Sequence, residues 1–475
     1  MEKIYNLFIN GKWQKPEKHL DVFFPYDGSL AGSVPDASIK EVEKIIQSAS
    51  KSRESARKLS AWQRYDILSK AANLIQTKKD EITNLIVMET GKPIAEAEIE
   101  VFRAIQTIIF SAEEAKRITG EIIPMDSHPL GANYFGFTIR EPKGVILAIV
   151  PFNAPFNLAC HKVGPAIASG NTVILKPSSL TPLSAYFLGE IFCEAGLPDG
   201  ILNVVSGNSS VIGDFLITHP EVNMVSFTGS LNVGKRIKNI AGLKTVTLEL
   251  GSNSSVIIEP ETDIKNIVPK FISSAFSNSG QVCISLQRAY VHEKIFEPLV
   301  EELKEGIKKM KIGNPFNKET QISSLISPEA STRVSSWIEG NVKSGAQILI
   351  GGKLTGRATI TPGLLTRTDP GMKIACEEVF GPIATIDPYE NFDDAIKKTN
   401  NSKYGLQVGV FTSDISKATS AIKYIEAGGV LINEFPSFRL DQMPYGGVKE
   451  SGTGREGPKF AIEEMTETKL IIIKN

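Results

Sequence analysis

The chain has 475 residues, of which 41% are hydrophobic and 22% charged, so its length suggests two or three globular domains and its composition excludes a disordered protein. Its 52 lysines and arginines nearly balance 53 aspartates and glutamates, which leaves a formal net charge of -1. Such a chain exerts no long-range attraction on phosphate backbones or anionic lipids, so we expect neither a nucleic-acid nor a membrane partner.

The first residues, MEKIYNLFINGKW, lack the apolar core of a secretory signal, and no uncharged apolar stretch elsewhere approaches about 18 residues. We therefore expect a cytoplasmic protein. The four cysteines are too few and too scattered for a disulfide framework and form no C-x-x-C pair, so no metal site is expected. Each is then either a buried, inert side chain or a chemically special thiol: Cys160, Cys193, Cys283 and Cys376.

Residues 38–119 repeat apolar side chains at steps of three and four, which predicts helices. Residues 120–142 carry Pro, Gly and Asn between β-prone runs, which favours a protruding β hairpin. From residue 143 onward short apolar runs alternate with helical segments, and a second such series begins near residue 264 and ends near residue 458. This alternation predicts an α/β fold with parallel sheets in two lobes.

The chain end, AIEEMTETKLIIIKN, finishes in a short and very apolar β-like run. A monomer would expose the consecutive apolar residues 470–473, and bare apolar edges invite strand pairing. We expect this run to pair with the 120–142 hairpin or with another subunit, above all with the hairpin of a neighbouring subunit. A tail folded back onto its own subunit is the alternative.

The segment GSLNVGK at 229–235 nearly spells a nucleotide-triphosphate loop, but Arg236 stands where the magnesium-binding hydroxyl should be. An ATPase is therefore disfavoured. The strand-like run MVSFT still leads into Gly229 and Gly234 at the start of a helix, where backbone N–H groups and the helix dipole can bind a pyrophosphate. An ordinary strand-to-helix turn is the alternative.

Three polar residues in separate segments are candidates for chemistry. Cys283 follows a glycine in SNSGQVCISLQR, although an isolated cysteine is more often a small buried hydrophobe. Glu249 ends the β-like run TLELG, where a carboxylate is costly unless it is hydrated, paired or functional. Asn153 lies among prolines in VPFNAPFN and fits either a turn residue or an aimed donor. Each residue alone leaves the chemistry open.

Taken in order, these segments resemble the aldehyde dehydrogenase superfamily over nearly the whole chain. The resemblance rests on nine blocks in family order: ETGKP at 89–93, PFN at 151–153, LKP at 175–177, FTGS at 227–230, LELG at 248–251, GQVC at 280–283, EEVFGP at 377–382, YGL at 404–406 and PYGGVKESGTGRE at 444–456. It implies two Rossmann-like parallel-sheet lobes with a small β oligomerisation element, in a homodimer or homotetramer. The implied division is a cofactor-binding domain at 1–119 and 143–250, a catalytic domain at 251–462, and an oligomerisation element at 120–142 and 463–475.

The resemblance also implies NAD(P)-dependent oxidation of a small aldehyde to its acid. Cys283 is expected to attack the carbonyl as a thiolate, while Asn153 and the Cys283 backbone N–H bind the oxyanion. Glu249 is expected to activate the water that hydrolyses the thioester, and Glu456 to support proton transfer. A coenzyme A-acylating enzyme and an inactive structural homologue are the alternatives. Glu249 argues against the first, and the presence of all three candidate residues argues against the second.

For the cofactor, the family pattern assigns Lys176 to the adenosine ribose and Glu378 to the nicotinamide ribose. Further contacts, the pyrophosphate's included, are expected from glycine, serine and apolar positions near the strand ends: Phe152, Gly229, Ser230, Gly234, Leu250 and Phe380. The chain departs from the pattern at Ser179, where many NAD-preferring members carry a glutamate that repels a 2′-phosphate. Either NADP or NAD is therefore acceptable. A second departure, at 252–253, affects only loop contacts.

The sequence indicates the substrate less clearly than the cofactor. Arg103 lies on a helix that, by the resemblance, passes the aldehyde tunnel, where a cation would suit a carboxylate, phosphonate or hydroxylated aldehyde. A solvent-facing arginine is the alternative. Aromatic side chains are further candidate substrate residues: Phe156, and Phe435 and Phe438 in the loop 432–442, where aromatic residues would narrow the tunnel toward small aldehydes. In the same loop Arg439 is a further candidate, but it fits slightly better as a structural partner of Asp441.

Overall fold

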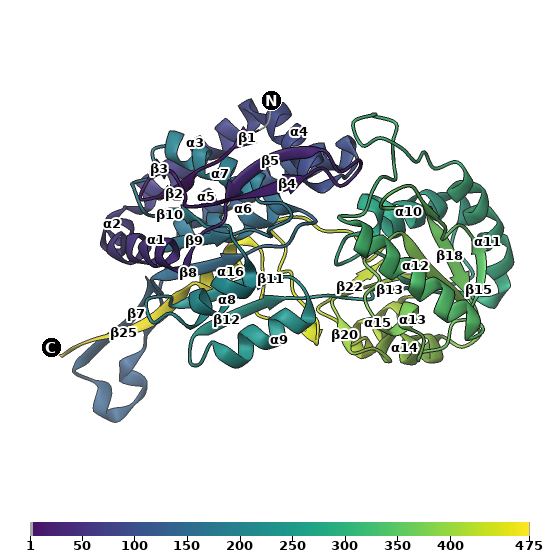
Figure 1. Cartoon of the computed structure of the whole chain (residues 1–475). Coiled ribbons are helices and arrows are strands. Elements are labelled where there is room, and N and C mark those ends of the chain that lie inside the picture. Colours follow the sequence, from purple (N-terminus) through teal and green to yellow (C-terminus); the bar gives the residue numbers. More distant parts are fainter. Residues whose placement is uncertain (1–2, 475) are drawn as a thin grey trace.

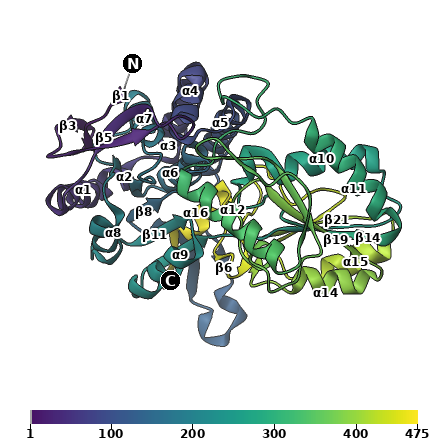
Figure 2. The same ribbon diagram turned by 45° about the vertical axis from the view of Figure 1, so that its right-hand side comes forward.

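A computed structural model describes residues 3–474. The N-terminal half of the chain forms one α/β lobe and the green segment of Figure 1 forms a second, while the yellow C-terminal segment crosses back to the first lobe. A β arm projects away from the first lobe in both Figure 1 and Figure 2. The predicted α/β class with two parallel-sheet lobes is confirmed.

The first lobe is organised around an eight-stranded sheet, as counted within residues 3–474, in the order β24-β12-β11-β8-β9-β10-β2-β3. The strands β12 to β10 run parallel. In β8, Val145 and Leu147 face one apolar core while Ile146 and Ala148 face the other, so both faces of the strand are buried. The bounds are β2 (Leu7–Ile9), β3 (Lys12–Gln14), β8 (Val145–Ile149), β9 (Thr172–Lys176), β10 (Leu202–Val204), β11 (Met224–Thr228), β12 (Thr245–Glu249) and β24 (Gly452–Thr453).

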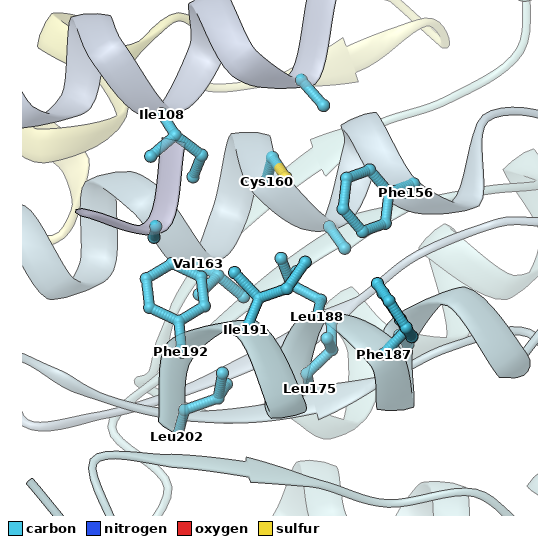
Figure 3. Packing of buried hydrophobic residues seen from close by; sticks show 14 of the residues in the cluster. Ile108, Phe156, Cys160, Val163, Leu175, Phe187, Leu188, Ile191, Phe192 and Leu202 are labelled. Carbon is cyan, nitrogen blue, oxygen red and sulfur yellow. The ribbon is translucent and has the colours of Figure 1, made fainter. Parts of the chain in front are cut away.

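Helices cover both faces of this sheet. One face carries α2 (Arg53–Lys58), α3 (Ala61–Thr77), α4 (Lys79–Thr90), α5 (Ile94–Ala115), α6 (Pro155–Ala168) and α7 (Leu183–Glu194), which enclose the core drawn in Figure 3. The other carries α1 (Ile39–Lys51), α8 (Ser209–Thr218) and α9 (Leu231–Ile240). The start of α1 is fixed by a capping box, in which Ser38 and Glu41 each bond the other's backbone N–H. The helical prediction for 38–119 is confirmed.

The second lobe is built on a sheet in the order β15-β18-β19-β14-β13-β21-β22, parallel from β18 to β22. Its strands are β13 (Ser255–Ile258), β14 (Arg288–His292), β15 (Gln347–Ile350), β18 (Gly363–Thr366), β19 (Ile383–Tyr389), β21 (Gln407–Phe411) and β22 (Gly429–Ile432). Its helices are α10 (Ile264–Phe276), α11 (Glu293–Lys308), α12 (Pro328–Lys343), α13 (Lys373–Cys376), α14 (Phe392–Asn400) and α15 (Ile415–Tyr424). Helices α10 and α11 pack against one face, and α14 and α15 against the other.

After β22 the chain spans both lobes before it ends. Strand β23 (Val448–Lys449) pairs with β20 (Tyr404–Gly405) of the second lobe. Strand β24 then joins the first sheet beside β12, with Gly452 opposite Glu249. Helix α16 (Pro458–Glu464) packs against α5 and α6. The segment 444–456 therefore lies beside the carboxyl end of β12, where Glu249 is held.

The β arm is a small antiparallel sheet of β6 (Ile122–Ile123), β7 (Tyr134–Pro142) and β25 (Thr466–Lys474). Two 3-10 turns, η1 (Met125–Ser127) and η2 (Pro129–Gly131), connect β6 to β7. Thr466 lies opposite Pro142, so β25 pairs with the hairpin of its own chain rather than with that of a neighbouring subunit. Leu470, Ile472 and Ile473 nevertheless stay about half exposed, so the arm keeps an open apolar surface.

Short elements complete the structure. They are β1 (Lys3–Ile4), β4 (His19–Phe23) and β5 (Leu30–Pro35) in a small sheet, the hairpin of β16 (Leu354–Thr355) and β17 (Thr359–Ile360), and the turn η3 (Ser277–Gly280). No helix between residues 3 and 474 combines the length and the apolar character that crossing a bilayer requires.

Candidate active site

A cavity of about 760 Å³ lies between the two lobes. Four strands of the first sheet end at its wall, because parallel strands place their carboxyl ends at one edge of the sheet. The residues that line the wall at these strand ends include Phe152 after β8, Lys176 in β9, Gly229 after β11 and Glu249 in β12. The second lobe contributes Cys283, Arg333, Glu378 and Phe380. The cavity is therefore a cleft of the size that small-molecule and cofactor sites occupy.

Cys283 is positioned by the sharp turn η3. Asn278 and Ser279 take left-handed backbone angles (φ 50° and 54°), and a Cβ on Gly280 would lie 2.0 Å from the Gly381 carbonyl oxygen. The Cys283 sulfur lies 2.8 Å from the Tyr445 hydroxyl oxygen. Burial raises the pKa of the Cys283 thiol to about 11, although the Tyr445 hydrogen bond and the charge of Arg439 act in the opposite direction.

Asn153 lies against the same turn. Its Nδ2 donates to the Gln281 carbonyl at 3.0 Å, and its own carbonyl accepts from Asn278 Nδ2 at 3.1 Å and from Lys92 Nζ at 2.6 Å. Lys92 in turn forms a buried ion pair with Glu100. The Asn153 side-chain amide therefore contacts Gln281, two residues before Cys283 in the sequence. Contacts from both lobes hold it there.

Glu249 faces the cavity from the end of β12 and is 4% exposed. Within the described part of the chain its Oε2 has no hydrogen-bond partner. Burial raises the pKa of Glu249 well above its ordinary value, and the neighbouring Glu456 carboxylate raises it further. Such an unpartnered, desolvated carboxylate is poised to exchange protons rather than to hold an ion pair.

Glu456 lies behind the cavity wall rather than on it. It accepts hydrogen bonds from Lys162 Nζ at 2.9 Å, Thr228 Oγ1 at 3.2 Å and Arg439 Nη2 at 3.1 Å. Burial alone would raise the pKa of Glu456, but Lys162 and Arg439 outweigh it and hold the pKa well below its usual range. Glu456 is therefore a fixed anion, in contrast to Glu249.

The predicted cofactor residues gather around the remainder of the cavity. Most of them line it directly: Phe152, Lys176, Ser179, Gly229, Ser230, Leu250, Glu378 and Phe380. Gly234 instead packs in α9, where an added Cβ would lie 2.5 Å from the Leu250 side chain. Phe152 and Phe380 meet edge to face across the lobes, with ring centroids 5.6 Å apart.

The charges on this wall fit a dinucleotide. Lys176 is 4% exposed, donates to Ser209 Oγ at 2.7 Å, and has its pKa lowered to about 8 by burial. Ser230 begins α9 without a side-chain cap, so the first N–H groups of that helix can bind an anion. Burial raises the pKa of Glu378 to about 7, and its Oε1 accepts from the Ser252 N–H at 3.1 Å. These donors and acceptors match a ligand rich in hydroxyls and phosphates.

Two charged residues of the cavity were not predicted as cofactor residues from the sequence. Arg236 and Asp214 both line the cavity and form an ion pair at 2.5 Å. The sequence did single out Arg236, but only as a defect in a phosphate loop. Its position on the first turns of α9 brings a guanidinium to the lining of the cavity, which also includes Ser179.

A second polar cluster lies beside Cys283, and it corrects one expectation. Arg439 is buried and pairs with Glu456 rather than with Asp441. Asp441 instead accepts from Arg103 at 2.8 Å and lies 2.9 Å from His161 Nε2. The Arg439 guanidinium packs 3.6 Å from the centre of the Tyr445 ring. Arg103 is thus neither free in solvent nor unpaired, and its side chain is 32% exposed.

None of the four predicted substrate residues, Arg103, Phe156, Phe435 and Phe438, lines the cavity, and two of them are buried elsewhere. Phe156 is fully buried in the first core beside Cys160, as Figure 3 shows. Phe435 is 1% exposed and packs on Phe411 behind the second sheet, with ring centroids 4.7 Å apart. The expectations that Phe156 contacts the substrate and that Phe435 narrows the tunnel are therefore wrong. Phe438 is 43% exposed.

The helical period explains the error at Phe156. Side chains one residue apart on a helix point in directions about 100° apart, whereas residues four apart share a face. Asn157 and His161, four apart on α6, are therefore the side chains that reach the Asp441 cluster. Phe156 and Cys160, also four apart, point into the core. The sequence signal that could have identified the correct pair is their polarity on an otherwise apolar helix.

A thiol, an aimed amide and a protonatable carboxylate at a dinucleotide-sized cleft, carried by two parallel-sheet lobes, are typical of oxidoreductases that use a covalent thiol intermediate. The chain belongs to the aldehyde dehydrogenase family, whose model matches residues 13–471. It is an aldehyde dehydrogenase.

Individual relatives cover the chain almost completely. The 3-sulfolactaldehyde dehydrogenase of Priestia megaterium is 44% identical over 99% of this chain and 98% of its own. The lactaldehyde dehydrogenase of Methanococcus maripaludis is 42% identical over 99% and 100%. Among solved structures, aldehyde dehydrogenase 21 of Physcomitrella patens with the reaction product succinate has a TM-score of 0.97 at 36% identity, covering 100% of this chain and 99% of the other. The NADP complex of the NADP-dependent glyceraldehyde-3-phosphate dehydrogenase of Bacillus halodurans has a TM-score of 0.96 at 35% identity, covering 100% of both.

Proposed function

We propose that this enzyme oxidises a short aldehyde bearing a hydroxyl or anionic group, and that it releases the acid by hydrolysing a thioester on Cys283. The observation that carries the proposal is that Cys283, Asn153 and Glu249 line one cavity. In addition, the Cys283 sulfur contacts the Tyr445 hydroxyl, and the buried Arg439 guanidinium packs on the Tyr445 ring.

In the first half-reaction the Cys283 sulfur adds to the aldehyde carbon and forms a thiohemiacetal. The Asn153 amide carries two N–H donors, of which one is used by the Gln281 carbonyl, so the other can bind the oxyanion together with the Cys283 backbone N–H. When bound, NAD(P) would supply the two-electron oxidation by which the thiohemiacetal becomes a thioester. Lys176, Ser230 and Glu378 are the residues that would hold it.

In the second half-reaction Glu249 takes a proton from the water that attacks the thioester. The raised pKa of Glu249 makes its carboxylate a stronger base than an exposed one, and its unpartnered Oε2 can accept the proton. Glu456 remains a proposed supporting residue: it accepts hydrogen bonds from Lys162 and Arg439, and its charge raises the pKa of Glu249.

The buried cation nearest to the Cys283 sulfur favours an anionic or hydroxylated substrate. This cation is Arg439, which acts on Cys283 against the carboxylates of Glu249 and Glu378 and belongs to a network of three cations, Arg103, Lys162 and Arg439, with two carboxylates, Asp441 and Glu456. Within the described residues Arg439 Nε has no hydrogen-bond partner. Dehydrogenases of sulfolactaldehyde and lactaldehyde are among the relatives, which supports the same substrate class.

For the cofactor, Ser179 offers a hydroxyl and no negative charge where a 2′-phosphate would approach, and Arg236, which is paired with Asp214, lines the same cavity. We propose that the enzyme accepts NADP as well as NAD. The NADP complex among the similar structures supports this reading.

An aldehyde panel tests the substrate class. Lactaldehyde, glyceraldehyde, succinate semialdehyde and phosphonoacetaldehyde are compared with propionaldehyde, a neutral control of similar length, with each cofactor. At least one hydroxylated or anionic aldehyde should exceed the neutral control about tenfold or more in kcat/KM, since one satisfied charged contact contributes about 1.5–3 kcal/mol. A preference for propionaldehyde would overturn the assigned class.

Two variants test the mechanism. Cys283→Ser should bind cofactor and lose nearly all oxidation, whereas Cys193→Ser, at an exposed thiol, serves as the matched control and should keep it. Glu249→Gln should still release a burst of reduced cofactor but turn over about 10²–10⁴-fold more slowly. Product formation that depends on coenzyme A in the wild type would favour the acylating alternative.

We further propose that the apolar face of the β arm, including Leu470 and Ile472, is covered in a homodimer or homotetramer. The division into a cofactor-binding domain, a catalytic domain and an oligomerisation element, with the boundaries given above, is part of the same proposal.

All four cysteines are free thiols, which supports a reducing compartment such as the cytoplasm.

A further inference from the structure

The hydroxyl of Tyr445 touches the sulfur on which the proposed function depends. The Tyr445 side chain is 3% exposed, and its hydroxyl oxygen lies 2.8 Å from Cys283 Sγ. Its apolar surroundings are Ile284, Leu406 and the Val282 side chain. A buried phenol in such a setting needs a partner, and the sulfur is the one it has in the described structure.

The tyrosine is braced on two sides. Its backbone exchanges hydrogen bonds with Glu456, at 3.0 Å from the Tyr445 N–H and 2.6 Å from the Glu456 N–H. The Arg439 guanidinium lies 3.6 Å from the ring centre and is itself fixed by Glu456. A cation over the ring face withdraws electron density from the phenol and so strengthens its O–H as a donor.

We infer that Tyr445 is a further catalytic residue, whose hydroxyl donates a hydrogen bond to the Cys283 thiolate and holds the sulfur at the cavity wall before the aldehyde arrives. The inference rests on the proposed role of Cys283 as the nucleophile. A thiolate carries no hydrogen, so once Cys283 has ionised only the tyrosine can be the donor. Burial raises the pKa of Tyr445, which keeps its hydroxyl protonated while the thiol ionises.

The contribution of Tyr445 must be separated from that of the charges around Cys283. Arg439, in the loop before β23, favours the thiolate, whereas Glu249 at the end of β12 and Glu378 before β19 oppose it. Removing only the hydroxyl leaves all three charges in place. Tyr445→Phe is therefore the direct test, and Tyr290→Phe, which removes a hydroxyl bonded to the Lys398 carbonyl in the second lobe, is the matched control.

The readout is the pH profile of Cys283 alkylation by iodoacetamide, followed on the Cys283 peptide so that the other thiols do not interfere. A hydrogen bond to a charged group corresponds to a shift of about one to two pH units, so Tyr445→Phe should move the midpoint upward by that amount. At neutral pH the rate should fall about three- to tenfold, because the loss of thiolate is partly offset by its greater intrinsic nucleophilicity. At high pH the variant should react faster than the wild type, so the two profiles cross.

A merely structural role of the tyrosine would lower all rates without moving the midpoint, and an unmoved midpoint in a folded Tyr445→Phe enzyme would overturn the inference. If that variant folds poorly, fluorotyrosine at position 445 keeps the shape and strengthens the donor, so it should move the midpoint downward; an unchanged midpoint again overturns the inference. Because alkylation needs no aldehyde or cofactor, failure of the inference differs from failure of the proposed function, which would appear as full activity of Cys283→Ser.

Discussion

Glu100→Gln is expected to destabilise the first lobe and to slow the oxidation step, because it breaks a buried ion pair behind Asn153. The Lys92 and Glu100 side chains are each 4% exposed. The Glu100 carboxylate also accepts the backbone N–H groups of Phe156 at 2.9 Å and Asn157 at 3.2 Å, in the first turn of α6. Both of these bonds go to Oε1, so a glutamine oxygen can still accept them, but the substitution leaves the Lys92 ammonium, which pairs with Oε2, without a counter-ion.

The magnitude follows from this burial. Removing one partner of a buried pair costs about 3–5 kcal/mol. For a unit of 150–250 residues, each kcal/mol lowers the Tm by about 2–4 °C, so Glu100→Gln should melt about 6–20 °C below the wild type. The double variant Lys92→Met, Glu100→Gln removes both charges and should recover part of the loss, with a coupling energy of about 2 kcal/mol.

The kinetic effect acts through Asn153, whose carbonyl is the other acceptor of Lys92 Nζ. Misalignment of the oxyanion donor should slow the burst of reduced cofactor about tenfold. This loss is smaller than the effect of removing such a donor completely, which is about 2.7–4 kcal/mol. The aldehyde KM should stay unchanged. Calorimetry and single-turnover absorbance measure the two effects. Glu81→Gln, which breaks the exposed Lys3 pair, is the control and should change neither. A Glu100→Gln enzyme with wild-type Tm and burst rate would refute the reasoning.

Three further predictions follow from the site and the arm. Thioester hydrolysis should accelerate as the pH rises through the elevated pKa of Glu249, since only the ionised carboxylate is a base. The measurement is the steady-state rate under conditions where deacylation is limiting, and a rate that does not change between pH 4.5 and neutrality would contradict the prediction. Ser179→Glu should lower the NADP to NAD ratio of kcat/KM at least tenfold by like-charge repulsion, and an unchanged ratio would place residue 179 away from the 2′-phosphate. Deleting residues 467–475 should give smaller and less stable species in light scattering, and a truncated protein of unchanged mass, or a monomeric full-length protein, would rule out the arm as the contact surface.

The elements that carry periodic patterns were predictable because their chemistry repeats along the chain. The alternation of apolar strands and helices after residue 142 fixes parallel sheets, and parallel sheets place their carboxyl ends together. Asn153, Lys176, Gly229 and Glu249 each follow or end such a strand, so their meeting at one cavity could be anticipated from position alone.

Contacts made by irregular loops were not predictable in the same way. In the loop 432–442 no helical or strand period fixes the side-chain directions, and nearness in sequence suggested that Arg439 pairs with Asp441. In the structure the two side chains belong to different hydrogen-bonded pairs, Arg439 with Glu456 and Asp441 with Arg103, which is 338 residues away. The pairing follows from where the middle of α5 and the segment after β24 lie in the folded chain, and that is a tertiary property.

The same tertiary arrangement explains why the polar cluster and the thiol are coupled. Arg439 contacts Glu456 and the Tyr445 ring and favours the thiolate of Cys283. One guanidinium therefore interacts with two groups of the segment 444–456 and with the thiol that follows the turn η3. Because Arg439 is buried, its charge is weakly screened by solvent, and it favours both the Glu456 anion and the Cys283 thiolate. A substitution such as Arg439→Met would therefore leave Glu456 with Lys162 as its one cation in the described structure and raise the thiol pKa at the same time. The return of the chain to the first lobe thus sets the ionisation of the nucleophile as well as the shape of the site.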